Sequence, residues 1–425
     1  MNSKPRTPPG LRQRMLALAL CAGFGLLHGP LGAQTAPPPS SMKALFDKAW
    51  ALHAEALAAP ARREAAAAQQ ALASKWTADA PSLELSLKSD RWNRNGGARE
   101  QELGVSVPLW LPGERGRSQA LADSAAQALD SRLLAAQWRV AALVRDAWWT
   151  AQLARVDRDL ASLRLQAAQR LSQDVGRRVK AGDLAKTDLL QAQSTEAAAE
   201  MDLAQAEQGL LQAVQILQGW GVDAEALGRM ATAGLAEAQP PEASQEPEPG
   251  HPALAELAAR AQVAQRALEL AEVQKRANPE LVLGTTRDRG AFGEAYGQTV
   301  TVGVRLPLGA PSAHRAKQAT ARAEQIEAEQ LLAQERQQLR AALMGARARL
   351  ASAQSALGAA ERRAQASRET RAHFEKSFQL GETDLPTRLR IEQEAFEAER
   401  QQARAQNALH QAVSNLRQAL GLLPQ

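Results

Sequence analysis

The sequence predicts a mainly α-helical protein with a small β part, built as an internal tandem repeat. Three observations predict this class. Long proline-free stretches carry apolar residues at coiled-coil spacing, short segments alternate apolar and polar residues, and landmarks of the first half recur in the second half. The expected order is helix, two strands, long helix, tight turn and helix, and it occurs twice.

The first 33 residues have the pattern of an export signal. Basic residues precede an apolar run from Met15 to Leu27, which is shorter than the ~20 residues that a membrane-spanning helix needs. Leu31-Gly32-Ala33 offers a small-residue cleavage site, so we predict that 1–33 is a cleaved signal peptide, with a short N-terminal anchor as the alternative. Cys21, the only cysteine, lies in this run without the context of an acylated lipoprotein, so the mature chain has no thiol.

Charge and motif content argue against nucleic-acid binding and catalysis. The net charge is +5, but residues 1–33 hold four basic and no acidic residues, so the mature chain carries 5 − 4 = +1. The sequence shows no Ser-His-Asp set, phosphate-binding loop or paired-carboxylate motif, and its histidines lack ligand spacing. We therefore predict no enzyme, no cofactor, no metal ligand and no nucleic-acid partner. The mature histidines are His53, His251, His314, His373 and His410.

The two halves of the chain are related by a nearly constant offset. Gly182-Asp183 matches Gly381-Glu382, since 381 − 182 = 199, and Pro108 and Pro307 differ by the same number. The repeats are predicted at 34–233 and 253–425, because the segment 234–252 between them is rich in proline, serine and glutamate and has the composition of an irregular linker.

Each half contains one predicted β-hairpin, at 82–110 and at 280–308. Alternation with period two gives each strand one apolar and one polar face. The polar, glycine-containing segments 92–99 and 290–297 supply the turns. The alternating apolar positions are Leu83, Leu85, Leu87, Leu103, Val105, Val107, Leu281, Leu283, Val300, Val302 and Val304.

Each half also contains a predicted long helical hairpin, at 117–218 and at 314–421. The proline-free stretch 118–180 alone would span about 95 Å as a helix. A further helix over 45–75, interrupted at Pro60, is expected before the first strand. Stripes with the coiled-coil period are Leu153, Val156, Leu160, Leu163, Ala167 and Leu171, then Leu339, Leu343, Ala346, Leu350, Ala353 and Leu357.

Two prolines separated by three residues mark each junction between the second strand and the long helix. They are Pro108 and Pro112 in the first half, and Pro307 and Pro311 in the second. Because proline lacks an N–H and fixes φ, each pair is expected to end the strand and redirect the chain. Trp110 lies at the same level, where either a membrane-interface position or ordinary packing accounts for it.

Strands with one apolar and one polar face suit a barrel with lipid outside and water inside. Four strands in one copy cannot close around a water-filled channel, so this interpretation requires several copies. A soluble β-sandwich that buries the same leucines is the alternative, although it would not require helices of this length.

These features together resemble the TolC-like outer-membrane efflux family over nearly the whole mature chain. The most specific residues form the turn 178–193, in which Gly182 is followed by Asp188-Leu189-Leu190-Gln191-Ala192-Gln193. The second copy of this turn runs over 378–390, where Arg388 stands close to the position of Asp188 in the first.

The resemblance implies a homotrimer whose twelve strands form an outer-membrane β-barrel on a periplasmic α-helical barrel. It also implies contact with outer-membrane lipid, docking to a periplasmic adaptor protein, and an inner-membrane pump, RND-type, upstream. The implied function is an exit duct for an efflux system. The Gly381-Glu382 tip is similar to the heavy-metal (CzcC-like) branch and favours metal ions over drugs or other small molecules as cargo. The alternative, a periplasmic adaptor (membrane fusion) protein of an efflux or secretion system, would show one helical hairpin rather than two.

The resemblance places the periplasmic tip and its adaptor contact at the turns of the helical hairpins. Both glycines also fit left-handed turns, and the acidic residues of the first turn also fit helix caps. For Asp188, a position facing the pore entrance is a further alternative. The implied tip residues are Gly182, Asp183, Leu184, Asp188, Gly381, Glu382 and Asp384.

Overall fold

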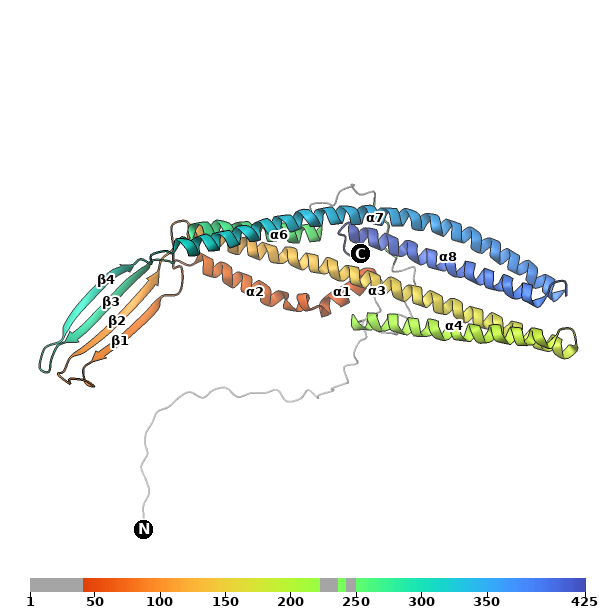
Figure 1. The fold of residues 1–425 in the computed structure, drawn as a ribbon, viewed down its shortest axis with the longest axis horizontal. Helices are drawn as coiled ribbons and strands as arrows, with labels where there is room; N and C mark the ends of the chain where they lie inside the picture. The colour runs from red at the N-terminus through yellow and green to blue at the C-terminus, as the bar shows by residue number, and fades with distance from the viewer. Residues whose placement is uncertain (1–40, 222–235, 242–249) are drawn as a thin grey trace, which may run out of the picture. The chain divides into compact units, whose positions relative to one another are not determined.

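The computed structural model describes residues 41–221, 236–241 and 250–425, which belong to one compact unit (Figure 1). The predicted signal peptide, including Cys21, and most of the predicted linker lie outside the described residues. The segment 236–241 of that linker is described, and it has no regular secondary structure.

In each half, helical structure precedes a pair of strands, a long helix and a shorter helix, with two described helices before the strands in the first half and one in the second. The predicted mainly α-helical class with four strands and an internal repeat is therefore confirmed. The first half consists of α1 (Met42–Leu52), α2 (Ala54–Ser74), β1 (Ser82–Ser89), β2 (Arg99–Pro108), α3 (Glu114–Ala181) and α4 (Lys186–Gly219). The second half consists of α6 (Pro252–Val273), β3 (Glu280–Arg289), β4 (Gly297–Arg305), α7 (Pro311–Gln379) and α8 (Leu385–Ala419).

The helices α3 and α7 are the longest elements, with 68 and 69 residues. Each would be about 100 Å long at 1.5 Å per residue. Toward the strands, α3 packs against α2 and α6, and toward the hairpin turns it packs against α4 and α8 (Figure 1). Helix α7 likewise packs against α6 and α8, so the two repeats meet along α3.

The predicted coiled-coil stripe is buried on α7 but only partly on α3. Leu343 and Leu350 pack with Val413 and Leu416 of α8. On α3, by contrast, Leu163 is 59% exposed, because a pocket lies between this part of α3 and α8. Of the predicted stripe on α3 only Leu171 is buried, together with Ala161, Ala168, Ser172 and Val175 outside the stripe.

The prediction that Pro60 interrupts the first helix is wrong. The interruption lies at His53, whose extended backbone ends α1 and whose Nδ1 accepts a hydrogen bond from the N–H of Glu55 at the start of α2. Pro60 lies inside α2 on its exposed side. There the carbonyl that loses its helical partner can be solvated, which lowers the cost of a proline within the helix.

The four strands form one antiparallel sheet in the order β1-β2-β3-β4. The register places Leu83, Val105, Leu283 and Val302 side by side on one face. That face is uncovered in the chain, with Leu85 74% and Val300 73% exposed, for example. Exposed apolar patches of this kind mark contact with a membrane or another protein.

The largest hydrophobic core of the described chain lies midway along α3. Trp148 and Trp149 are fully buried there, against Leu45 and Phe46 of α1 and Leu217 of α4. The indole N–H of Trp149 donates to the Ser414 hydroxyl at 2.9 Å, which ties α3 to α8 of the second repeat.

No helix among the described residues combines the length and the apolar character needed to cross a membrane.

Candidate functional site

The first hairpin tip is a tight turn around Gly182. This glycine has φ of 89°, and its N–H donates to the carbonyl of Val179 while the N–H of Asp183 donates to that of Arg178. The Asp188 carboxylate accepts from the N–H of Ala185 at 3.1 Å, which caps α4. Among the alternatives for Asp188, the structure therefore shows helix capping. Asp183 is exposed, whereas Leu184 is half-buried.

The second tip repeats this backbone with a different cap. Gly381 has φ of 79°, and the N–H of Glu382 donates to the carbonyl of Ser377. Here the carboxylate of Asp384 accepts from the N–H of Thr387 at 3.3 Å. The first tip thus uses the acid at the third helical position, and the second uses the acid preceding the helix.

The two tips meet at Phe378, the buried aromatic residue near the end of α7. Two guanidinium groups contact its ring, with the centre of the ring 5.0 Å from that of Arg178 and 4.7 Å from that of Arg388. Arg178 also donates to the carbonyl of Phe378 at 3.2 Å. Cation–π contacts at partly buried sites contribute about 0.5–2 kcal/mol each. Arg388 stands close to the position that Asp188 has in the first copy. Its contact with Phe378 gives the second tip a use for a cation at this position.

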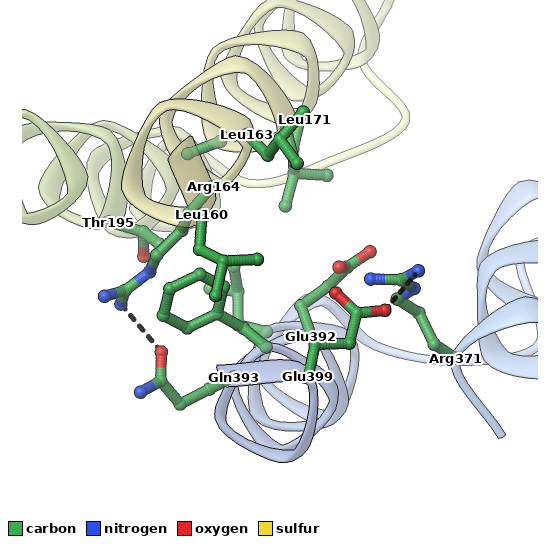
Figure 2. A pocket seen from close by; sticks show the side chains of 13 residues that line it. Leu160, Leu163, Arg164, Leu171, Thr195, Arg371, Glu392, Gln393 and Glu399 are labelled. Carbon is green, nitrogen blue, oxygen red and sulfur yellow. Dashed lines mark hydrogen bonds and ion pairs between the residues drawn. The ribbon is translucent and has the colours of Figure 1, made fainter. Parts of the chain in front are cut away.

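Farther from the tips, α3 and α8 enclose a pocket of about 100 Å³ (Figure 2). Leu160, Leu163 and Phe396 supply its apolar lining. Arg164 donates to Gln393 across the pocket at 2.7 Å and forms an ion pair with Asp202.

One acid in this pocket makes no hydrogen bond to a described residue. Arg371 pairs with Glu399 at 3.1 Å (Figure 2). Glu392 has no hydrogen bond to a described residue, and burial raises the pKa of its carboxyl group above the usual range. The pocket combines apolar side chains with both acidic and basic ones, but none of the predicted tip residues lines it.

The predicted junction prolines lie where the strands give way to the long helices. Pro108 is the last residue of β2, and Pro311 is the first residue of α7. Pro112 precedes Gly113, which has φ of 78° and begins α3, and Pro307 follows the end of β4. The indole N–H of Trp110 donates to the carbonyl of Lys75 at 3.1 Å, which ties the junction to the end of α2.

A buried carboxylate, absent from the sequence predictions, holds this junction together. Glu114 is 2% exposed and accepts from the N–H of Leu111 at 2.9 Å. It also accepts from the side-chain amides of Gln274 at 2.6 Å and Asn278 at 2.7 Å. The carboxylate therefore connects the start of α3 to the segment between α6 and β3.

Replacing Glu114 with alanine is expected to destabilise the protein by about 3 kcal/mol, because three donors lose their buried acceptor. The temperature at which the folded band disappears in semi-native electrophoresis measures this loss. Glu294→Ala is the matched control, since Glu294 accepts from the N–H groups of Gly290 and Ala291 in an exposed turn. Equal melting temperatures for the two variants would contradict the role assigned to Glu114.

A second buried network lies in the described part of the predicted linker. The Glu237 side chain is 2% exposed and pairs with Arg145 at 2.6 Å and with Arg417 at 3.1 Å. Arg145 also donates to Gln418 at 2.5 Å and to the carbonyl of Leu422 at 3.1 Å. The linker segment is therefore fixed between α3 of the first repeat and α8 of the second.

His251 begins α6 in a buried position. Its Nδ1 accepts from the N–H of Ala253 at 3.3 Å, and its ring meets that of Trp138 edge-on at 5.1 Å. Burial lowers the pKa of this imidazole, and its Nε2 has no hydrogen-bond partner among the described residues. Because Nδ1 accepts the bond from Ala253, the neutral ring carries its proton at Nε2. Charging the buried ring would add a second proton at Nδ1, which would break the bond from Ala253.

The lowered pKa of His251 predicts a loss of stability in acid. Between the folded pKa and the unfolded value of about 6.5, the unfolded chain binds more protons, so the free energy of unfolding falls as pH drops below that value. We expect the denaturant midpoint of the wild type to decrease more than that of His251→Asn between about pH 7.5 and about pH 5.5. Asparagine keeps a helix cap without titrating. Identical pH profiles would contradict the prediction.

Among the described residues, no group of three or more His, Cys, Asp and Glu side chains is arranged to hold a metal ion.

The fold and tips define a class of duplicated proteins in which each repeat joins a β-hairpin to a long helical hairpin. A family model described as "Outer membrane efflux protein" matches residues 45–220 and 245–422. The chain belongs to this family of outer-membrane efflux transport proteins.

Solved structures of outer-membrane channels share this TolC-like fold. CusC is 18% identical with a TM-score of 0.73, covering 90% of this chain and 92% of that chain. VceC of Vibrio cholerae is 16% identical with a TM-score of 0.71, covering 89% and 96%. MtrE of Neisseria gonorrhoeae is 16% identical with a TM-score of 0.68, covering 90% and 89%. No curated protein matches the chain.

Sequence reasoning located the tips but missed Glu114, Glu237 and Phe378. For Glu237, the sequence carries an indirect signal at its ion-pair partner Arg145. Arg145 and Asp146 interrupt the otherwise apolar stretch 140–149, and the structure buries Arg145 while Asp146 is exposed. A buried ionised side chain requires a buried counter-ion. The identity of that counter-ion could not be read from the sequence, because Glu237 lies 92 residues away.

Proposed function

We propose that this protein is the homotrimeric exit duct of a tripartite efflux system, passing substrates from a periplasmic adaptor and an inner-membrane pump of RND type across the outer membrane. The observation that carries this proposal is the uncovered apolar face of a sheet whose two edge strands, β1 and β4, are each paired on one side only. Lipid on the apolar face and neighbouring copies at the edges would satisfy both features.

The order of the elements favours a ring of copies. The two free edges of the sheet are formed by different strands: β1, which follows α2, and β4, which precedes α7. Joining one edge to the opposite edge of the next copy is a head-to-tail contact, which closes into a ring when the rotation permits. Four strands from each of three copies would make the twelve-stranded barrel expected from the family resemblance.

The adaptor contact is proposed at the two hairpin tips, at Gly182, Asp183 and Leu184 and at Gly381, Glu382 and Asp384. Both glycines leave open space around the Cα atom, with no heavy atom within 4 Å of an added Cβ. Exposed turns with open surroundings are accessible to a partner. Asp188 contributes by capping the helix that supports the first turn.

Metal ions are the proposed cargo, on the resemblance of the Gly381-Glu382 tip to the heavy-metal branch. A deletion strain challenged with metals, drugs and dyes tests this part of the proposal. Hypersensitivity to metal ions alone is expected, and a phenotype confined to drugs or dyes would contradict metal cargo.

Fractionation and cross-linking test the duct itself. The wild type should appear in outer-membrane fractions as a heat-modifiable trimer. The mature chain as predicted lacks cysteine, so Asp183→Cys introduces a unique thiol at the exposed first tip. We expect this thiol to cross-link to the adaptor, while a control cysteine at Ser355, on the exposed surface of α7, should not. A chain recovered as a monomer outside the membrane would contradict the duct.

A further inference from the structure

The apolar face of the sheet ends in a row of arginines toward the hairpin turns. Nearer the helices, the cross-strand neighbours on this face are mostly aliphatic, as at Leu85 and Leu103, with Thr285 between Leu103 and Val300. Toward the turns, Arg287 is the register partner of Gln101 on the neighbouring strand. Two residues further along each strand, Arg99 stands directly opposite Arg289. The side chains therefore change from aliphatic to cationic within four residues of a strand.

The carboxylates at this height lie on the other face. Lys88, Glu100 and Asp288 are cross-strand neighbours there, and Lys88 pairs with Glu100 at 3.0 Å. The side chain of Arg99 forms no hydrogen bond or ion pair with any described residue, and it is exposed. Like charges directly opposite each other destabilise a sheet. An anion bound near the Arg99–Arg289 pair would therefore reduce the repulsion between the two side chains.

Aromatic rings hold the other two guanidinium groups in place. Arg287 lies 4.5 Å and Arg289 5.0 Å from the ring centre of Tyr296. Arg289 also lies 5.7 Å from Phe292 and donates through Nε to the carbonyl of Gly97 at 3.0 Å. Stacked guanidinium groups keep their outward N–H donors available, and the planar fork of these donors matches a phosphate group.

We infer that this arginine row binds the phosphate of anionic lipid headgroups at the membrane surface. The inference rests on the proposed insertion of the sheet in the outer membrane. Arg99 lies eight residues along β2 from Val107, which is about 26 Å along the strand and about 20 Å across a membrane for a strand tilted by about 40°. This height is close to the ~25 Å apolar band of membrane barrels, so the row lies at headgroup level.

The β1–β2 turn supports the same occupant. Trp92 is 95% exposed and is flanked by the exposed residues Arg91 and Arg94. Phe292 in the neighbouring turn is 61% exposed. Indole and phenyl rings beside guanidinium groups suit a boundary that is apolar on one side and anionic on the other. A lipid surface supplies both properties, whereas free phosphate supplies only the charge.

A lipid titration of the purified full-length protein tests the inference. Wild type and Arg99→Gln/Arg287→Gln in neutral detergent are titrated with phosphatidylglycerol, with phosphatidylcholine, or with inorganic phosphate. The readout is the temperature at which the folded band is lost. Phosphatidylglycerol should raise this temperature for the wild type, and the double variant should need about 25-fold more of this lipid, at about five-fold for each arginine. Both arginines are exposed, and the structurally bonded Arg289 stays intact.

Lys88→Gln is the matched control, because it removes a cation at the same height from the opposite face, and it should respond as the wild type does. Equal responses of wild type and double variant, an equal loss in Lys88→Gln, or an equal shift with inorganic phosphate would each overturn the inference. A wild type that is absent from outer-membrane fractions would contradict the proposed function instead. A membrane-inserted wild type that is indifferent to phosphatidylglycerol would contradict the lipid site alone.

Discussion

Replacing Glu237 with glutamine is expected to destabilise the protein by about 3–5 kcal/mol, because two buried guanidinium groups lose their shared counter-ion. The side chains of Arg145 and Arg417 are 2% and 5% exposed, so water cannot replace the carboxylate without opening the core. A loss of this size should lower the temperature at which the folded band disappears by on the order of 5–10 °C.

An exposed ion pair supplies the control for this experiment. Asp130 pairs with Arg63 at 3.4 Å, with side chains 73% and 64% exposed. Asp130→Asn should change stability by less than about 1 kcal/mol, since solvent screens such pairs. A Glu237→Gln variant as stable as Asp130→Asn would show that the linker segment does not hold the two repeats together.

A second variant separates the lost charge from the lost packing. Glu237→Gln/Arg417→Met removes one buried cation together with the carboxylate, and the methionine fills much of the same volume. This double variant should recover part of the stability lost in Glu237→Gln, since fewer charges remain buried without a partner. If instead the two losses simply add, Glu237 and Arg417 are not coupled in the way that their 3.1 Å contact indicates.

The elements of this fold were predictable because local patterns specify them. The period-two alternation at Leu83, Leu85 and Leu87 identifies a strand whatever its partners are, and Gly182 marks a hairpin turn because positive φ favours glycine. The resemblance also located the tips. Helix breaks were less predictable, since the sequence draws attention to Pro60 while the break lies at His53, where a side-chain cap forms.

Contacts between the repeats could not be predicted from one sequence. The segment at Glu237 has the composition of a flexible linker, yet its carboxylate lies in the core beside a residue 180 positions later. The same holds at the tips, where Phe378 joins Arg178 across 200 positions. Such pairings depend on how α3 and α8 pack, and neither hydrophobic period nor propensity contains that information.

At the first tip, Gly182→Arg is expected to reduce efflux to the level of a deletion strain while leaving trimers intact. No heavy atom lies within 4 Å of an added Cβ, so the arginine would project from the turn into the proposed adaptor contact rather than into the protein. The cost to the fold is limited to the backbone, because a side chain at φ of 89° costs about 1–2 kcal/mol. Resistance assays and semi-native electrophoresis measure the two effects separately.

Gly182→Asn separates this backbone effect from steric and electrostatic obstruction, because asparagine tolerates the left-handed conformation and carries no charge. It should retain most of the efflux, and Gly381→Arg should lose efflux as Gly182→Arg does if both tips dock. Wild-type efflux in Gly182→Arg would remove the first tip from the contact. Equal inactivity of Gly182→Asn and Gly182→Arg would mean that the geometry of the turn, rather than access of a partner to it, is what efflux requires. Since these variants alter turns that are far from the sheet, a normal trimer band in each would show that the loss of efflux does not come from a loss of assembly.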